Sequence, residues 1–448
     1  MLDLEQYQIA GTTAGDIAAS TEAAIRSGHL DSGSLLPTVR GLSGALGNSP
    51  ATVSSAYRIL RERGLIVTDG RRGTRVAPRP PVRTPEPGPS VLAATAGRRD
   101  LALGMPDPEL LPSLADAIAR IDLSGRLEMS ELEHADPELL ELARSAFAAS
   151  GVPAEHLAVT SGAFDGIERV LRAHLRPGDR VLVEDPVYTS VRDLLLGLGL
   201  IPVAVGIDDS GPLPEPFAAA LRRGVQGIVL IPRSQNPFGA ALDEQRAAEL
   251  RDLLAAHPEV LLVEDDHTGP ISGVPALTLV GAGCRHWAVV RTASKALHPD
   301  LRVAVAAGDE TTIARVEGLQ ALGPGWVSHV LQAAVVAIAR DPGFEPIIAR
   351  ASQTYASRRR ALLDALAERG IAAHGRSGLN VWVPVREETP VIRALADAGW
   401  IAQAGERFRI EAPPGVRVTI ATLPESEAAE VAEVVAGVEH AGRPRREY

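Results

Sequence analysis

Lysine is almost missing from this sequence. The chain has 45 lysines and arginines, and Lys295 is the only lysine, so the other 44 are arginines. A guanidinium stays charged in proteins, whereas a lysine amine can lose its proton and condense with a carbonyl as a Schiff base. The isolated lysine is therefore either a remaining surface charge or a covalent anchor for an aldehyde, and its neighbours must decide between the two.

Other scarce features exclude whole classes of protein. Cys284 is the only cysteine, which excludes a disulfide framework and a cysteine metal cluster and fits a reducing cytoplasm. No apolar run approaches the ~18 residues of a membrane span. The acidic, polar N-terminus is unlike a signal peptide. The formal net charge of −11 argues against a nucleic-acid coat protein but allows a small DNA-binding module within the 448 residues.

Residues 1–77 are expected to form a first domain. The apolar spacing predicts a helix with Ile17, Ile25 and Leu30 on one face, a helix opening at Pro37 and ending at Gly47, a helix over 50–63, and strands over 65–68 and 74–76. A helix–turn–helix followed by a two-stranded wing is typical of DNA-binding domains.

Polar and basic residues mark the expected DNA-binding surface. Short polar side chains crowd the start of the third helix, where Asn48 or Ser49 can cap the free backbone N–H groups. Arginines at the wing tip suit phosphate or a minor groove. The candidate DNA-contacting residues are Arg40, Asn48, Ser49, Thr52, Ser54, Ser55, Arg58, Arg71 and Arg72.

This first domain resembles the GntR family of bacterial regulators. The resemblance rests on Leu36-Pro37-Thr38-Val39-Arg40, Leu46-Gly47, Thr52-Val53, Ala56-Tyr57, Gly64 to Val67 and Gly73-Thr74. A proline-rich stretch follows at residues 78–99, and repeated prolines favour an extended, semi-rigid linker.

Residues 100–448 are expected to form an α/β domain. Short apolar runs at 157–160, 181–184, 228–231, 260–263, 288–291 and 303–306 alternate with helical segments such as 161–175. That alternation predicts a mostly parallel sheet with helices on both faces. From about 340 to 448, a helix over 358–368 and strands over 379–385, 408–411 and 416–422 predict a smaller α+β subdomain.

Polar residues follow several of the predicted strands, where sites in open α/β sheets lie. Ser161, Gly162 and Ala163 open a helix whose N-terminus suits a phosphate. Tyr188 suits stacking on an aromatic ring, or packing at a rim. The amide of Asn236 can donate to a phenolate oxygen.

The acidic run Glu264-Asp265-Asp266 ends another strand. One carboxylate there suits a protonated pyridine nitrogen, although a metal site or a helix cap has the same pattern. Around the lysine, Thr292, Ser294 and Arg302 supply hydroxyls and a guanidinium that suit a dianionic phosphate. These neighbours favour the covalent-anchor interpretation of Lys295.

Together these motifs resemble fold-type-I, class I aminotransferases, which bind pyridoxal 5′-phosphate (PLP). The resemblance implies that Lys295 forms the Schiff base with PLP, that Asp265 contacts the pyridine nitrogen and that Asn236 contacts the 3′-oxygen. It also implies that Arg417, in a late strand, binds a substrate carboxylate. A GntR-like head on such a body is the layout of the MocR subfamily of regulators, which implies a homodimer.

Two residues depart from the aminotransferase pattern. His267 stands where the family usually has a tyrosine near the cofactor, and the segment 126–147 contains no tyrosine to reach a partner subunit's phosphate. Both differences weaken the case for efficient transamination more than the case for PLP binding.

We therefore expect a cytoplasmic, PLP-responsive transcription regulator that binds operator DNA as a homodimer, rather than a physiological enzyme. Its effector is PLP or an amino compound, and no metal is expected. One alternative is an active aminotransferase with a DNA-binding head. Another is a DNA-binding protein whose body has lost PLP and serves as a dimerisation scaffold.

Overall fold

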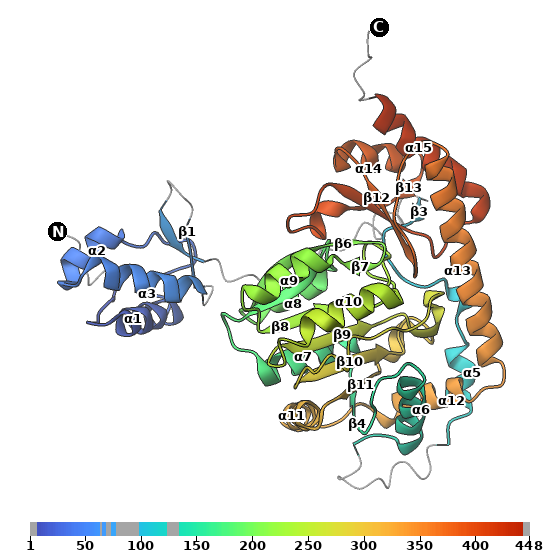
Figure 1. The fold of residues 1–448 in the computed structure, drawn as a ribbon, viewed down its shortest axis with the longest axis horizontal. Helices are drawn as coiled ribbons and strands as arrows, with labels where there is room; N and C mark the ends of the chain where they lie inside the picture. Colours follow the sequence, from blue (N-terminus) through green and yellow to red (C-terminus); the bar gives the residue numbers. More distant parts are fainter. Residues whose placement is uncertain (1–6, 63–64, 69–72, 78–97, 123–133, 442–448) are drawn as a thin grey trace. The chain divides into compact units, whose positions relative to one another are not determined.

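The computed structural model describes residues 7–62, 65–68, 73–77, 98–122 and 134–441. The chain divides into two compact units, one built on the N-terminal residues and one that holds most of the rest. Figure 1 shows both units, coloured along the sequence.

The N-terminal unit contains α1 (Ala14–Arg26), α2 (Val39–Leu46), α3 (Pro50–Glu62), β1 (Ile66–Thr68) and β2 (Thr74–Val76). Thr13 and Asp16 form a capping box at the start of α1. The second helix begins after the predicted Pro37, because Thr38 is its N-cap and accepts from Gly41 N at 3.1 Å. Leu30, predicted on the first helix, lies beyond its end but is buried in the same core.

Apolar side chains from all three helices form the core of this unit. Leu42 of α2, together with Val53 and Leu60 of α3, is fully buried. Tyr57 is also buried, and its hydroxyl donates to Pro37 O at 2.8 Å. With this face of α3 turned inward, the helical period leaves polar residues such as Ser54 and Arg58 exposed.

The larger unit is built on an eight-stranded sheet in the order β4-β11-β10-β9-β8-β5-β6-β7. Its strands are β4 (His156–Thr160), β5 (Arg180–Asp185), β6 (Ile201–Asp208), β7 (Gly211–Pro212), β8 (Gly227–Leu230), β9 (Leu261–Asp266), β10 (Trp287–Thr292) and β11 (Ala304–Gly308). Strands β5, β8, β9 and β10 pair in parallel, while β11 is antiparallel to both of its neighbours. The structure confirms the predicted mostly parallel sheet and shows that one inner strand, β11, runs antiparallel to its neighbours, which the sequence did not predict.

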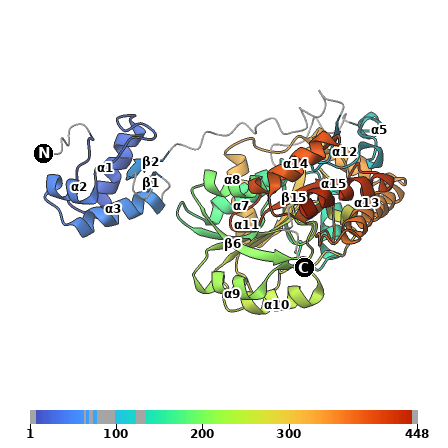
Figure 2. The same ribbon diagram turned by 90° about the horizontal axis from the view of Figure 1, so that it is seen from above.

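Helices cover both faces of this sheet. α7 (Ala163–His174) contacts α11 (Glu310–Ala321), and α9 (Pro214–Arg222) contacts α10 (Glu244–Leu254). Figure 2 shows these two pairs on opposite sides of the sheet, with α8 (Thr189–Gly197) beside α7. The strands between them are therefore buried on both faces, which explains their continuous apolar runs.

A small subdomain packs beside the sheet. Its three-stranded sheet has the order β12 (Asn380–Pro384), β15 (Gly415–Thr419), β14 (Gln403–Ala404), and α13 (Phe344–Ala367), α14 (Glu388–Asp397) and α15 (Ala428–Ala441) cover it. β3 (Arg99–Asp100), from far earlier in the chain, pairs in parallel with β13 (Trp400–Ile401). The start of the larger unit is thus tied to its end.

The strand predicted at 408–411 is wrong. The backbone N–H groups of Ile410, Glu411 and Ala412 all donate to the carboxylate of Asp185, at 2.6–2.9 Å. Amides that bind a side chain in this way are not available to a neighbouring strand. Asp185 therefore fixes a loop of the small subdomain against the end of β5.

The remaining helices are α5 (Leu114–Ala119), α6 (Pro137–Ala148) and α12 (His329–Ala339). None of the helices in the described residues combines the length and apolar character needed to cross a membrane.

Candidate functional site

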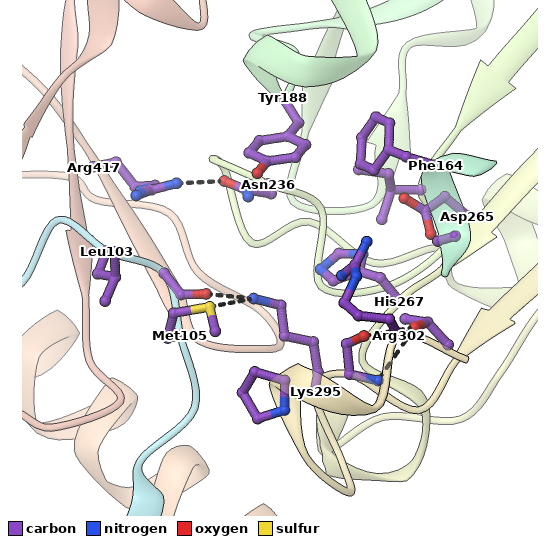
Figure 3. A pocket seen from close by; sticks show the side chains of 16 residues that line it. Leu103, Met105, Phe164, Tyr188, Asn236, Asp265, His267, Lys295, Arg302 and Arg417 are labelled. Atoms are coloured by element: carbon purple, nitrogen blue, oxygen red, sulfur yellow. Dashed lines mark hydrogen bonds between the residues drawn. The ribbon is translucent and has the colours of Figure 1, made fainter. Parts of the chain in front are cut away.

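A cavity of about 220 Å³ lies where the strands of the large sheet end, against the small subdomain (Figure 3). It is lined by Leu103, Gly104, Met105, Ala163, Phe164, Tyr188, Ile231, Asn236, Asp265, His267, Thr292, Ser294, Lys295, Pro299, Arg302 and Arg417. The structure therefore brings most of the predicted cofactor residues into one pocket, although they come from distant parts of the sequence.

Lys295 follows the end of β10 and projects into this pocket. Its Nζ donates to Gly104 O at 2.8 Å and lies 3.4 Å from Met105 Sδ. Burial, helped by the nearby Arg417 charge, lowers the pKa of Lys295 to about 8. A larger fraction of the amine is neutral near neutral pH than for an exposed lysine, which is the form that attacks a carbonyl.

Asp265 and Asp266 face different surroundings. Asp265 lines the pocket, is buried, and has an Oδ1 atom with no hydrogen-bond partner among the described residues. Burial and the neighbouring Asp266 raise the pKa of Asp265 to about 7. Asp266 instead accepts from Arg233 Nε and Nη2, both at 2.7 Å, and from Arg291 Nε at 2.9 Å. Asp265 is thus the carboxylate that is free to meet a cationic ring nitrogen.

His267 also faces the pocket, where its Nδ1 is buried and lacks a partner within the part of the chain that the structure describes. Burial first, and then the positive charge of Lys295, lowers the pKa of His267 to about 4. At neutral pH the ring is therefore an uncharged imidazole, which can donate from one nitrogen and accept at the other.

One end of the pocket suits an anion. Gly162 precedes α7 with φ +97°, and an added Cβ would lie 2.8 Å from Arg302 Nη2, so the guanidinium rests against this glycine. Ala163 and Phe164, in the first turn of α7, line the same end. A helix N-terminus beside a guanidinium attracts a phosphate.

Two hydroxyl residues complete this end, whereas the predicted Ser161 lies outside the pocket lining. Thr292 Oγ1 and Ser294 Oγ lie 3.1 Å apart at the pocket wall. Ser161 was predicted to join them, but it is exposed and outside the pocket lining. Its backbone N–H donates to Asp165 Oδ2 at 2.9 Å, because the chain turns at this point to start α7.

The opposite end holds a buried arginine. Arg417 projects from β15, donates from Nη1 to Asn236 Oδ1 at 3.0 Å and from Nη2 to Ala102 O, and lies over the Phe408 ring. Burial lowers the pKa of Arg417 to about 10, which still leaves it charged at neutral pH. A buried guanidinium at the pocket wall suits a carboxylate.

Tyr188 forms an aromatic wall with Phe164, with ring centroids 5.8 Å apart. Sequence reasoning missed Phe164, and it also missed Leu103, Gly104 and Met105. Those three residues carry no chemical motif and come from the start of the larger unit, so no spacing rule connects them to Lys295. The signal that could have found them is a glycine that suits a turn, since Gly104 has φ +65°.

The predicted DNA-contacting residues lie at several places on the N-terminal unit. Arg40, Ser49, Ser54 and Arg58 are exposed, while Thr52 and Ser55 are half-buried. Ser49 caps α3 by accepting from Thr52 N at 3.1 Å, whereas Asn48 donates to Gly11 O at 2.9 Å. The Asn48 amide is therefore engaged within the unit, and Arg71 and Arg72 lie outside the described residues.

Comparison with known proteins matches both units. Residues 100–435 match the family of class I and II aminotransferases, and residues 13–76 match the gntR family of bacterial regulatory proteins. The vitamin B6 salvage pathway transcriptional repressor PtsJ of Salmonella typhimurium is 36% identical over 426 residues, which cover 94% of this chain and 96% of PtsJ. The chain belongs to the MocR-type transcriptional regulators. The regulator TauR of Rhodobacter capsulatus has the same extended similarity, 29% identical over 398 residues and 80% of each chain.

The larger unit of this MocR-type regulator has an aminotransferase fold. Kynurenine aminotransferase of Pyrococcus horikoshii superposes with a TM-score of 0.70 at 22% identity, over 79% of this chain and 94% of the enzyme. That fold implies PLP dependence. The pocket fits the cofactor, because the same cavity contains an amine of lowered pKa, a carboxylate oxygen that has no partner among the described residues, and an anion-binding end.

Proposed function

We propose that this regulator binds PLP in the pocket and responds to it through Lys295. The observation that supports this most directly is that Asp265 Oδ1, which has no hydrogen-bond partner among the described residues, shares a pocket with the only lysine in the sequence. A buried carboxylate oxygen without a partner is costly, and a protonated pyridine nitrogen would satisfy it. When bound, PLP supplies an aldehyde that reacts with the amine and an electron-withdrawing ring.

The other pocket residues take roles that match their chemistry. Arg302, Ser294, Thr292 and the start of α7 hold the phosphate. Tyr188 stacks on the ring, while Asn236 and His267 reach its polar edge. Arg417, already bound to Asn236 Oδ1, receives the carboxylate of an amino compound that enters beside the cofactor. The presence of these side chains in the cavity lining supports the proposed roles.

Regulation by vitamin B6 agrees with the relatives. PtsJ, whose name places it in a vitamin B6 salvage pathway as a repressor, is similar over nearly the whole chain. We infer that PLP, or an amino compound exchanging with it, shifts the larger unit between conformations and so changes operator binding by the gntR-type unit. Because its target is chromosomal DNA, the protein acts in the cytoplasm.

The operator-bound form is a homodimer. The segment that joins α11 to α12 exposes large apolar side chains, with Leu322 88% and Trp326 49% accessible and Val330 of α12 40% accessible. Trp326 stacks between His134 and His329, with ring centroids 6.2 and 6.4 Å away. Such a patch suits burial against a second copy, and a two-fold dimer matches paired DNA half-sites.

A working aminotransferase is the second candidate. The Arg417–Asn236 pair favours it, because a guanidinium held in place by an amide can bind the carboxylate of an amino-acid substrate. The replacement of the usual tyrosine by His267 opposes it. Multiple turnovers with amino-acid and keto-acid pairs would establish the enzyme, whereas a single spectral change without turnover would support the regulator.

The decisive test uses wild type and Lys295→Arg, a control that keeps the charge but not the amine. Borohydride added with PLP should attach one cofactor to the wild type by intact mass and none to the variant. PLP should then change promoter-DNA affinity in the wild type alone. Equal DNA affinity with and without bound PLP in the wild type would refute regulation by PLP.

A further inference from the structure

The segment Ala102–Met105, here called the strap, crosses the pocket between two fixed points. Upstream, Leu101 N donates to Ile401 O and Thr419 N donates to Leu101 O, both at 2.8 Å. Downstream, Asp107 N donates to the Tyr355 hydroxyl at 3.0 Å. The strap is therefore held at both ends, and Leu103, Gly104 and Met105 line the pocket between them.

The strap accepts hydrogen bonds from both of the cationic side chains that are proposed to bind a ligand. Gly104 O accepts from Lys295 Nζ at 2.8 Å, and Ala102 O accepts from Arg417 Nη2. A carboxylate that pairs with Arg417 competes directly with Ala102 O. When a neutral amine condenses with an aldehyde, both of its hydrogens leave with the carbonyl oxygen as water, so Nζ loses the hydrogens that it donates to Gly104 O.

A side chain just upstream sets the shape of the strap. Asp100 Oδ1 accepts from Ala102 N at 2.7 Å and from Leu103 N at 3.0 Å, which makes a local turn. Asp100 also belongs to β3, which pairs with β13. Displacement of the strap thus acts on β3, and β3 follows in sequence the residues 78–97 that lead from the gntR-type unit.

We propose that the strap couples ligand binding in the pocket to β3. The strap carbonyls hold Lys295 and Arg417, and a ligand that binds either side chain releases the strap and shifts β3. This proposal rests on ligand binding at Lys295. It differs from the proposed function in naming the segment that moves, and in predicting that a residue outside the pocket lining, Asp100, sets the response.

The test compares wild type, Asp100→Ala and Asp100→Asn as full-length proteins, with hydrogen exchange of the Ala102 and Leu103 amides, which donate to Asp100, measured with and without PLP. In the wild type, PLP should speed exchange of these amides about tenfold or more, since opening of the strap breaks their hydrogen bonds. Asp100→Ala should exchange fast already without PLP and bind PLP more tightly. Asp100→Asn keeps an acceptor oxygen and should behave like the wild type.

The outcomes separate this inference from the proposed function. If PLP attaches to Lys295 and changes DNA affinity, but exchange of the Ala102 and Leu103 amides is unchanged, the strap does not couple the pocket to the rest of the unit. If Asp100→Ala matches the wild type in both exchange and PLP affinity, the strap proposal also fails. If PLP does not attach to wild-type Lys295, the proposed function fails first.

Discussion

Asp265 and Asp266 are adjacent in the sequence, but their replacement by asparagine should change stability in opposite directions. Asp266 is buried and accepts hydrogen bonds from Arg233 and Arg291. Asparagine there leaves two cations next to a neutral group, and breaking a buried ion pair costs about 3–5 kcal/mol. Asp265 has an Oδ1 without a partner in the described chain, so asparagine removes a charge that burial disfavours.

The size of the Asp265 effect follows from its pKa. Burial and Asp266 raise the pKa of Asp265 from an ordinary 3.8 to about 7. A raised carboxyl pKa means that stability is fully present below pH 4 and is lost as pH rises toward 7. At ~1.4 kcal/mol for each pH unit, the charged form lowers the free energy of unfolding by about 4 kcal/mol above pH 7. Asp265→Asn should recover most of that difference.

Urea unfolding of full-length protein stripped of PLP measures both changes. Asp265→Asn should match the wild type at pH 4 and unfold at higher urea at pH 8, while Asp266→Asn should unfold at lower urea at pH 8. An advantage of Asp265→Asn that does not vary between pH 4 and pH 8 would refute the reasoning, as would a loss equal to that of Asp266→Asn.

Three further substitutions test other parts of the chain. Burial and the nearby His286 lower the pKa of His174 to about 4. The free energy of unfolding should therefore fall by about 1–2 kcal/mol as the pH is lowered from 6.5 to 4. If the free energy of unfolding of His174→Asn, measured with urea, falls equally over the same pH range, the prediction is wrong. Gly162→Ala places a Cβ against Arg302 at φ +97°, a strain of about 1–3 kcal/mol, and spectral titration should show weaker PLP binding. Tyr57→Phe removes the bond to buried Pro37 O and should lower the stability of the N-terminal unit by about 1–2 kcal/mol, whereas an unchanged melting profile would argue against that bond.

Much of the fold was predictable because its determinants are local. The apolar runs of β5, β8, β9 and β10 are continuous because both faces of the sheet are covered. Polar residues after these strands share one pocket, since parallel strands end at one edge. The placement of Asn236, Asp265 and Arg302 in one cavity could therefore be inferred without coordinates.

The rest depends on contacts between distant residues. Nothing near Ile410 in the sequence shows that its amide donates to Asp185, so a strand was predicted where a loop exists. Sequence position also does not show that Asp266 is bound by Arg233 and Arg291, which lie on other segments, while Asp265 lines the pocket. The strap was missed because backbone carbonyls hold the pocket side chains, and a sequence pattern reports side chains alone.

The single lysine has a consequence for how the protein coexists with a reactive metabolite. Free aldehydes form Schiff bases with accessible lysine amines. Here the other 44 cationic side chains are guanidiniums, which stay protonated, and the one side-chain amine lies in a pocket under Gly104 O. The arginine-rich surface therefore resists adventitious modification, and one chain offers one side-chain amine to one aldehyde. For the proposed PLP sensor, this composition would confine covalent modification of side-chain amines to Lys295.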